Sequence, residues 1–407
     1  MKVLIVSYLL DPRLGGGAAT SALRLCRGLV TQGVEVVAVT THGEQQPTTS
    51  EQDGFRVHYF RPHNLYWVAD KDRQPLPKKI VWQFVDTWNP HVYRHMRDII
   101  RRERPDVVHV HKLRGLSPSV WTAAAAENCH PIVQTCRDYE IVSPEGLLES
   151  AVGRLALRRH WTLHPYQAAR ARWSRAVDVV TAPSRFTLET ITGLGFFDGA
   201  RALVVPNTHG YQAAELPRLR LEAETQPADG AFRFLYLGRV ESAKGVDVLL
   251  SAFAEIAASI PHAHLDVAGN GTRAEALRQQ YGALSQVRFH GHVAGNNKDR
   301  LIAQADVVVM PSIVREVFGN SIIEAFAFGK PVLAARIGGM PELVRPGQTG
   351  LMVEPGDVAG LSQALYELAT APKSVRAMAS ACIAAAYDYT LEAVTDGYRR
   401  AYETGRP

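Results

Sequence analysis

Long hydrophobic runs are absent from this 407-residue sequence. A helix that crosses a bilayer needs about 18 or more consecutive apolar residues, and no stretch of the chain approaches that length. The apolar residues 3–6 are too few for the hydrophobic region of a secretory signal peptide, so we expect them to form a buried strand. The sequence thus predicts a cytoplasmic protein and gives no indication of a membrane-spanning one.

Cysteine is scarce. The four cysteines lie far apart in the chain, and none forms a Cys-x-x-Cys pair. Zinc sites and disulfide scaffolds need characteristic cysteine spacings, so the sequence favours neither class. We expect all four to be buried free thiols: Cys26, Cys129, Cys136 and Cys382.

A strong excess of one charge is also missing, because the formal net charge is only +5. Residues 1–210 carry 26 Lys and Arg against 19 Asp and Glu, whereas residues 211–407 carry 19 against 21. This imbalance is too small to indicate nucleic-acid binding, but it suits a phosphorylated substrate or an anionic membrane surface. The basic and aromatic residues 154–175 would either lie on such a membrane or form a solvated helical face.

What the sequence does contain is a repeated alternation of strand and helix signals. Hydrophobic residues make up 46% of the chain, which is too apolar for a disordered protein. The strand signals are short, β-branched and apolar throughout, which is typical of parallel strands covered by helices on both faces. They lie at residues 3–6, 34–39, 107–110, 132–135, 177–182, 203–205, 232–236, 264–268, 287–290, 307–310 and 332–335. The sequence therefore predicts the α/β class.

The alternation is interrupted once, at the polar and acidic residues 211–230, which contain two prolines and resemble a linker in composition. Residues 1–210 and 231–387 each begin with a strand and a glycine-bearing turn. We expect two Rossmann-like, doubly wound parallel-sheet domains facing each other across a cleft, with ligands outside the carboxyl ends of the strands. Residues 388–407 should include a helix that crosses back to the first domain.

Two cations flank a helix start after the strand signal at 232–236. Gly238 and Arg239 follow the strand, and Lys244 and Gly245 precede the helix. A diphosphate needs such positive side chains together with the N–H groups of a helix N-terminus. The alternative is a pair of ordinary basic residues on a surface loop.

Two glutamates follow the strand signal at 307–310. Glu316 lies in the loop, and Glu324 lies in the first turns of the next helix. Eight helical residues would span about 12 Å, comparable to a nucleotide sugar from hexose to ribose, so the two carboxylates could bind hydroxyls at opposite ends. The backbone N–H groups between them, which could meet a phosphate or sugar, belong to Phe318, Gly319, Asn320 and Ser321. Glutamates near a helix start are, however, also favoured by the helix macrodipole alone.

Two glycine clusters follow other strand signals. Residues 15–17 precede a helix expected from about Ala18. Their backbone N–H groups could approach a ligand closely, or the glycines could only permit a turn. Gly269, Gly271 and Ala274 match a dinucleotide-binding fingerprint weakly, but no carboxylate follows the next strand to hold a ribose. A nicotinamide-dependent oxidoreductase is therefore disfavoured.

In combination, these motifs resemble the retaining GT-B glycosyltransferases of the large family 4, or group 1, type, which includes sucrose synthase and bacterial mannosyl- and glucosyltransferases. The likeness covers nearly the whole chain. It rests on residues 16–17, 106–111, 238–239, 244–245, the Glu316/Glu324 pair, 338–342 and 347–355. The resemblance implies retaining sugar transfer from a nucleotide-diphosphate sugar, UDP- or GDP-linked, that the C-terminal domain binds. It also implies catalysis with no metal and no bound cofactor.

The resemblance also implies roles for individual residues. Arg239 and Lys244 would stabilise the leaving diphosphate, and Glu316 would hold hydroxyls of the donor sugar, which makes these three the catalytic candidates. The other donor-binding candidates are Gly16, Gly17, Gly238, Gly269, Asn270, Val293, Phe318, Gly319, Asn320, Ser321 and Glu324. The acceptor would be a glycan, a lipid-linked molecule or a small molecule, and the basic first domain could contact the inner membrane face.

One position departs from the family pattern. Many members carry His-Asp-Tyr where this chain has Arg137, Asp138 and Tyr139. A guanidinium is always charged and cannot act as a neutral acceptor, so Arg137 puts donor or acceptor choice in question. We expect His111, Arg137 and Asp138 on the acceptor side and His109 in the core.

Two other functions stay open from the sequence. One is a sugar-nucleotide epimerase or phosphorylase on the same scaffold; an epimerase would need no acceptor. The other is a non-catalytic nucleotide-sugar-binding protein, which the replacement of the usual histidine by Arg137 would suit.

Overall fold

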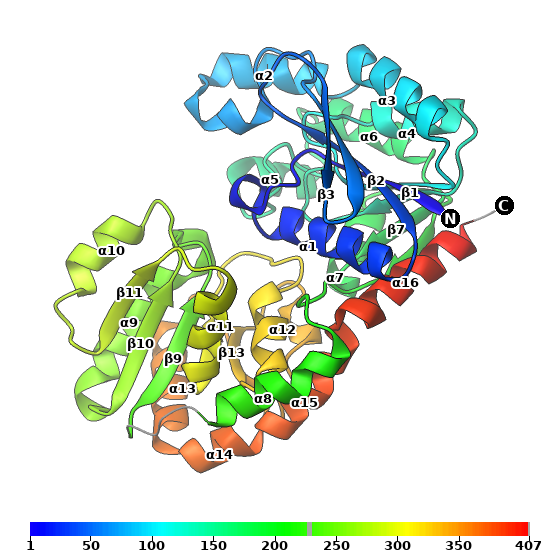
Figure 1. Cartoon of the computed structure of the whole chain (residues 1–407). Coiled ribbons are helices and arrows are strands. Elements are labelled where there is room, and N and C mark those ends of the chain that lie inside the picture. Colours follow the sequence, from blue (N-terminus) through cyan, green and yellow to red (C-terminus); the bar gives the residue numbers. More distant parts are fainter. Residues whose placement is uncertain (226–229, 406–407) are drawn as a thin grey trace. The chain divides into compact units, whose positions relative to one another are not determined.

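The computed structural model describes residues 1–225 and 230–405, apart from the side chains of residues 12–15 and 72. The chain divides into two compact units. Unit 1 comprises Met1–Asn207 and the chain from Val394 onward, and unit 2 comprises Thr208–Ala393. Each unit has a largely parallel sheet with helices packed on both faces (Figure 1). The predicted α/β class is therefore confirmed.

An eight-stranded sheet forms the centre of unit 1. Its strands, from one edge to the other, are β3 (Thr48–Gln52), β4 (Phe55–Phe60), β2 (Glu35–Thr41), β1 (Lys2–Ser7), β5 (Val107–Lys112), β6 (Ile132–Thr135), β7 (Val179–Ala182) and β8 (Arg201–Val204). All neighbours pair in parallel except β3 and β4, which form an antiparallel hairpin.

The helices of unit 1 lie on both faces of this sheet (Figure 1). One face is covered by α1 (Pro12–Thr31) and α16 (Leu391–Thr404), which share a buried cluster with Val3 and Ile5 of β1. Because Tyr398 and Tyr402 of α16 lie in this cluster, the end of the chain belongs to the core of unit 1. The remaining helices are η1 (Val68–Arg73), α2 (Leu76–Val85), α3 (Pro90–Glu103), α4 (Ser119–Ala126), α5 (Ala151–Leu157), α6 (His164–Ser174) and α7 (Arg185–Thr192).

Unit 2 has a six-stranded, fully parallel sheet. Its order is β11 (Val287–Gly291), β10 (Ala263–Ala268), β9 (Phe232–Leu237), β12 (Val307–Met310), β13 (Val332–Ala335) and β14 (Gly350–Val353). The helices are η2 (Ala213–Glu215), α8 (Leu216–Glu224), η3 (Ser242–Lys244), α9 (Val246–Ile256), η4 (Ala257–Ser259), α10 (Ala274–Tyr281), α11 (Gly295–Gln304), α12 (Asn320–Ala327), η5 (Met340–Glu342), α13 (Val358–Thr370), α14 (Pro372–Ala377), α15 (Ala379–Ala386) and η6 (Tyr387–Tyr389).

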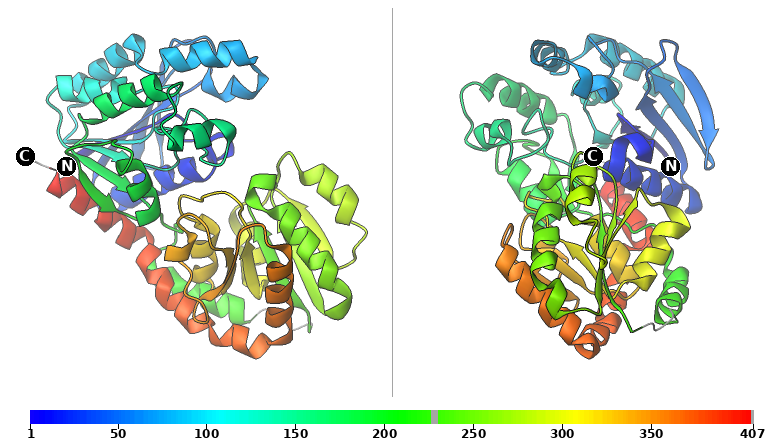
Figure 2. Two further views of the ribbon diagram at one scale, coloured as in Figure 1. Left: turned by 180° about the vertical axis from the view of Figure 1, so that it is seen from behind. Right: turned by 90° about the vertical axis from the view of Figure 1, so that its left-hand side faces the viewer.

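Alternate side chains of β9 enter two separate hydrophobic clusters on opposite faces of the sheet. Phe234 and Tyr236 pack with α9, α10 and α13, whereas Leu235 packs with α8, α11 and α12. Figure 2 shows helices on both sides of this sheet. A strand buried on both faces explains why its sequence is apolar without polar alternation.

The structure corrects the linker prediction for residues 211–225. This segment contains η2 and α8, and Leu216 and Leu219 are buried in the core of unit 2. Two leucines three positions apart lie on the same side of a helix, which is enough apolar surface to hold a short helix to the sheet. Residues 226–229 of the predicted linker lie outside the described residues.

Two further predictions and one unpredicted hairpin can be compared with the structure. All four cysteines are buried free thiols, which confirms that prediction. Residues 154–175 fall in two helices, α5 and α6, and Arg170 is buried beside Asp86. Of the six arginines in this stretch only Arg170 is buried, whereas Arg154, Arg158, Arg159, Arg172 and Arg175 are exposed. A solvated face, carried by two helices rather than one, therefore fits this stretch, and its contact with a membrane stays a prediction. The β3–β4 hairpin was not predicted, although Asp53 and Gly54 at its turn, both with positive φ, are a typical hairpin signal.

A buried carboxylate joins three elements of unit 1. Glu103, the last residue of α3, accepts from Lys2 Nζ of β1 at 2.8 Å and from Arg56 Nη1 of β4 at 3.1 Å. His58 Nε2 lies 2.8 Å from its other oxygen. Burial alone would raise the pKa of Glu103, but the hydrogen bonds from Lys2, His58 and Arg56 lower it to about 2.

Replacing Glu103 by Gln should reduce the free energy of unfolding at pH 7 by on the order of 3 kcal/mol. The native pKa lies below the ordinary 4.5, so the stabilisation is complete above pH 4.5 and is lost as the pH falls toward about 2. Urea denaturation of both proteins between pH 2 and pH 7 measures the difference. Glu35→Gln, which removes only an exposed partner of Lys2, is the matched control, and an equal loss in that variant would contradict the account.

Candidate functional site

The carboxyl ends of four adjacent parallel strands carry every site residue that was predicted in unit 2. Gly238, Arg239 and Lys244 follow β9; Gly269 and Asn270 follow β10; Val293 follows β11; and Glu316, Phe318, Gly319, Asn320, Ser321 and Glu324 follow β12. Because the strands are parallel, these positions share one edge of the sheet, where α/β proteins bind ligands. We call it the carboxyl edge of unit 2.

An ion pair joins the loops that follow the two central strands, β9 and β12. Lys244 Nζ lies 2.6 Å from Oε1 of Glu316, and the Ser312 hydroxyl donates to the same oxygen at 2.8 Å. Both charged side chains are partly exposed. The predicted cation and the predicted sugar-binding carboxylate therefore contact each other directly, with one carboxylate oxygen engaged twice.

Arg239 is held through its backbone while its side chain is exposed. The Tyr236 hydroxyl donates to the Arg239 carbonyl. The guanidinium makes no hydrogen bond or ion pair with any residue that the structure describes. Its donors can therefore bind an anion at the carboxyl edge without breaking a contact within the chain.

The second predicted carboxylate lies on α12, whose N-terminus is fixed against β9. Ser321 Oγ donates to the Leu237 carbonyl at 2.9 Å. Glu324 is buried, and its Oε1 lies 3.0 Å from Lys298 Nζ of α11. Sequence reasoning missed Lys298, because no motif joins a lysine of one helix to a glutamate of the next.

Close backbone packing explains the glycine that follows β10. Gly269 has φ near 149°, and a Cβ atom there would lie 1.7 Å from the Gly238 carbonyl oxygen. The Gly238 N–H donates to the Ala268 carbonyl at 3.0 Å, and the Val240 N–H donates to the Asn270 carbonyl at 2.9 Å. The two loops thus continue the pairing of their strands, while Val293 packs against the cluster on the α12 side.

Gly269→Ala should destabilise unit 2 by about 3 kcal/mol, because the added carbon requires both a backbone shift and an unfavourable φ. Gly238→Ala is the matched control, since its Cβ atom would make only ordinary contacts with the Tyr236 side chain, the nearest being the hydroxyl at 3.5 Å. Denaturant unfolding of the two variants gives the comparison. Equal stabilities would show that the close approach of the two loops is not a constraint.

The predicted donor-binding glycines of unit 1 lie on α1, after β1. The helix expected from about Ala18 is present: α1 begins at Pro12, but its backbone is non-helical at Gly16, with φ 58° and ψ −147°, and the regular helix runs from just after this kink to Thr31. Thr20 and Ser21 donate their hydroxyl protons to the carbonyls of Gly16 and Gly17. Both glycines are exposed, and their role toward a donor stays a prediction.

Arg137 is tied to three side chains of unit 1. Its Nε donates to His111 Nδ1 at 2.8 Å, one Nη donates to Asn207, and the other donates to the Tyr398 hydroxyl at 3.4 Å. Burial, with His109 and Arg137 nearby, lowers the pKa of His111 well below its ordinary value. The imidazole is therefore neutral, and because Nδ1 accepts a hydrogen bond, Nε2 must carry the proton.

His109 is the core histidine that was predicted. It is buried, and its two ring nitrogens lie 2.8 Å from the Tyr402 hydroxyl and 2.7 Å from Thr135 Oγ1. The His109 and His111 rings are 4.1 Å apart, because residues two apart on a strand project from the same face.

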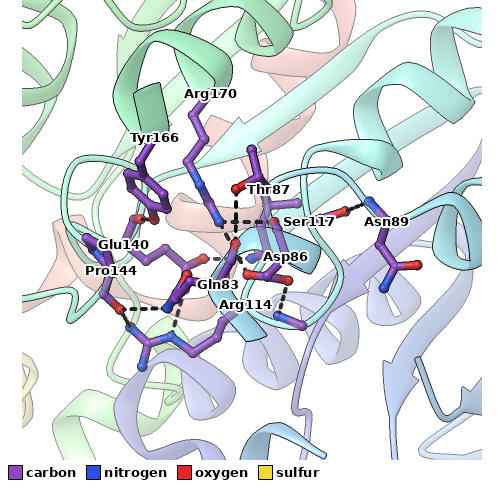
Figure 3. Close-up of polar contacts among 12 residues, drawn as sticks. Gln83, Asp86, Thr87, Asn89, Arg114, Ser117, Glu140, Pro144, Tyr166 and Arg170 are labelled. Atoms are coloured by element: carbon purple, nitrogen blue, oxygen red, sulfur yellow. Dashed lines mark hydrogen bonds and ion pairs between the residues drawn. The ribbon is translucent and has the colours of Figure 1, made fainter. Parts of the chain in front are cut away.

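Asp138 belongs to a buried network of charges that sequence reasoning missed. Its carboxylate lies 2.6 Å from Lys112 Nζ. Figure 3 shows the adjoining part, in which Glu140 and Asp86 lie among Arg114, Arg170 and Tyr166. Burial raises the pKa of Asp86 to about 7, although Arg170 opposes the shift. Burial and the neighbouring Asp138 carboxylate raise the pKa of Glu140.

The three acceptor-side candidates share one small pocket of about 10 Å³ in unit 1, and Glu140 also lines it. His111 Nε2 and Glu140 Oε2 are buried with no hydrogen-bond partner. His111 Nε2 is a donor and Glu140 Oε2 is an acceptor, so together they can bind a hydroxyl group or a water molecule.

The described residues contain neither a cluster of metal-binding side chains nor a membrane-spanning helix. Within residues 1–225 and 230–405, no group of three or more His, Cys, Asp or Glu side chains is placed to hold a metal ion. In the same ranges, no helix is both long enough and apolar enough to cross a bilayer.

Comparison with known proteins gives matches over both units. Residues 16–208 match the family model "Glycosyl transferase 4-like domain", and residues 231–371 match "Glycosyl transferases group 1". A glycogen synthase of Mycobacterium tuberculosis is 28% identical over 94% of this chain and 89% of its own length. Together, the two family models leave only short segments of the chain unmatched.

Solved structures agree with the observed fold. Sucrose-phosphate synthase of Thermosynechococcus elongatus superposes with a TM-score of 0.75 at 20% identity, over 99% of this chain and 98% of that one. The Anabaena protein HepE, in complex with UDP-glucose, has a TM-score of 0.67 at 20% identity, over 99% of this chain and all of that one. The chain therefore has the GT-B fold and belongs to the group 1, family 4-type glycosyltransferases.

Proposed function

We propose that this glycosyltransferase moves a sugar, with retention of anomeric configuration, from a nucleotide-diphosphate sugar to an acceptor hydroxyl in glycan, polysaccharide or glycolipid assembly. The observation that carries the proposal is the Lys244–Glu316 pair at the carboxyl edge of unit 2, with the exposed Arg239 on the same edge. UDP is the favoured nucleotide, because HepE was solved with UDP-glucose, and GDP is the alternative.

The cations account for departure of the nucleotide. As the bond between the anomeric carbon and the diphosphate breaks, negative charge develops on the leaving phosphate oxygens. Arg239, Lys244 and the backbone N–H groups at the start of α12 would stabilise that charge, each contributing roughly 3–4 kcal/mol. Fixed cations of this kind can do the work that a metal ion does in other transferases, so we propose that the reaction needs none.

The carboxylates account for placement of the donor. Glu316, oriented by Ser312 and Lys244, would accept hydrogen bonds from the sugar hydroxyls. Glu324, held by Lys298, would accept from the ribose hydroxyls. Because these oxygens are already oriented, little side-chain freedom would be lost when the donor binds.

Retention follows if the acceptor oxygen attacks from the face that the diphosphate leaves. The new bond joins the acceptor oxygen to the anomeric carbon, and the acceptor proton passes to the leaving phosphate. No side chain need act as the base. A reaction without a side-chain base is compatible with Arg137, because a guanidinium is always charged and cannot accept a proton. Arg137, which already donates to His111 and Asn207, would orient the acceptor instead.

Lys244→Ala and Glu324→Gln should each lower the rate of sugar transfer by about a hundredfold or more, because each removes a contact to the diphosphate or the ribose. Lys373→Ala, a change of an exposed lysine on α14, is the matched control. Initial rates with radiolabelled UDP-sugars, with circular dichroism to verify folding, provide the measurement. A chelator should leave the rate unchanged, and full activity in both variants would remove the assignment.

We also propose that unit 1 contacts the inner membrane face through α2. Leu76, Ile80 and Phe84 are 69%, 51% and 73% exposed, and their spacing of four places them in one stripe along the helix. Lys78 is exposed and Lys79 is half-buried on the same helix. Apolar and basic side chains together are typical of helices that lie on anionic bilayers.

Replacing Ile80 and Phe84 together by Ser should reduce co-sedimentation of the protein with phosphatidylglycerol-containing vesicles at least about fivefold, because the buried apolar area is lost. Leu221→Ser removes a similarly exposed leucine from α8 and serves as the control. Unchanged sedimentation of the double variant, or equal loss in the control, would contradict a role for α2.

A further inference from the structure

A second pocket lies at the opposite, amino edge of the unit 2 sheet. It has a volume of about 470 Å³, within the range of roughly 300–1,000 Å³ usual for small-molecule sites. It is bordered by the residues that immediately precede β9, β12 and β13 and by side chains of α8 and α14. None of the residues that we assign to sugar transfer lines it, so ligand binding in this pocket does not depend on the proposed function.

Positive charge predominates in the lining of this amino-edge pocket. The charged residues are Arg220, Glu224, Arg233, Asp306, Lys330 and Arg376. Arg220 and Glu224 form an ion pair at 2.7 Å and so neutralise each other. The Asp306 carboxylate accepts from the backbone N–H of Arg233 at 2.8 Å, and its charge interacts with Lys330, Arg376 and Arg233. Three cations face this one carboxylate, so positive charge remains in excess, and we assign the available part mainly to Lys330 and Arg376.

Lys330 is the most informative of these residues. Gly329, with φ 69°, lies in the turn between α12 and β13, and the half-buried Lys330 follows it, two residues before the strand. Its ammonium group makes no hydrogen bond or ion pair with the part of the chain that the structure describes. Burial lowers the pKa of Lys330 to about 8, although Asp306 and Glu224 oppose the shift. A partly desolvated cation without a partner is costly, and a bound anion would relieve that cost.

The rest of the lining is largely apolar. It includes Phe232, Ala303, Phe328, Ala369, Val375 and Ala379. Such a wall favours contact with the organic part of a ligand and gives an inorganic anion nothing to pack against. Cations beside an apolar wall fit a molecule with a phosphate group at one end and an organic group at the other.

We propose that the amino-edge pocket of unit 2 binds a phosphate-bearing organic small molecule, with the phosphate on Lys330 and Arg376 and the organic group against the apolar wall. The pocket is separate from the carboxyl edge, where the same sheet would bind the donor. Unit 2 would then bind two phosphorylated ligands, one at each end of its strands.

Competitive acetylation of lysines tests the proposal locally. The full chain is treated with trace acetic anhydride at pH 7.5, and modification of each lysine is quantified by mass spectrometry. Phenyl phosphate, inorganic phosphate and sodium chloride at matched ionic strength are the three arms. Phenyl phosphate should reduce acetylation of Lys330 by about fivefold or more, because a bound phosphate keeps the amine protonated and shields it from the reagent. It should reach this protection at a lower concentration than inorganic phosphate does. Lys373, exposed on α14, reports non-specific effects.

In the Arg376→Gln variant, Lys330 is still present and its acetylation can still be measured. The phenyl phosphate concentration that halves this acetylation should rise by about tenfold, as expected for the loss of one charge-assisted hydrogen bond. Protection that chloride reproduces, that Lys373 shows equally or that Arg376→Gln leaves unchanged would overturn the proposal. Equal protection by inorganic and phenyl phosphate would overturn the assignment to an organic ligand.

Discussion

The organisation of unit 2 depends on how the loops that follow its two central strands meet. Ile313 donates to the Ala243 carbonyl at 3.2 Å, and a Cβ atom on Gly245 would lie 1.8 Å from the Pro311 carbonyl oxygen. This backbone contact brings Lys244 within 2.6 Å of Glu316. A cation that could neutralise a diphosphate and a carboxylate that could bind a sugar are therefore placed together before any ligand arrives, which is the preorganisation that charge stabilisation in a transition state needs.

Much of this arrangement could be predicted from the sequence, because parallel strands carry their loops to a common edge. Apolar β-branched runs located β6, β12 and β13 at their observed bounds, and the residues after each strand then had to share an edge. The segments that escaped prediction have weak patterns. The strand β3 is polar and fully exposed, and α8 is held to the core by only two leucines, Leu216 and Leu219.

The partners of charged side chains were harder to predict than their positions. Lys298 holds Glu324, and Arg137 bonds to Asn207 and to Tyr398, which lies 261 positions later in the chain. A sequence shows that a charge is present but not which distant group satisfies it, because that depends on tertiary packing. The same holds for Lys330, whose significance comes from its burial and from the absence of an ion-pair partner among the described residues.

A crystal structure of the protein with bound UDP tests the central claim most directly. The account predicts that diphosphate oxygens lie within about 3 Å of Lys244 Nζ and the Arg239 guanidinium, that the ribose hydroxyls meet Glu324, and that the start of α12 faces the phosphates. A nucleotide bound elsewhere on the chain, or one bound at the carboxyl edge of unit 2 without contact to these three side chains, would contradict it.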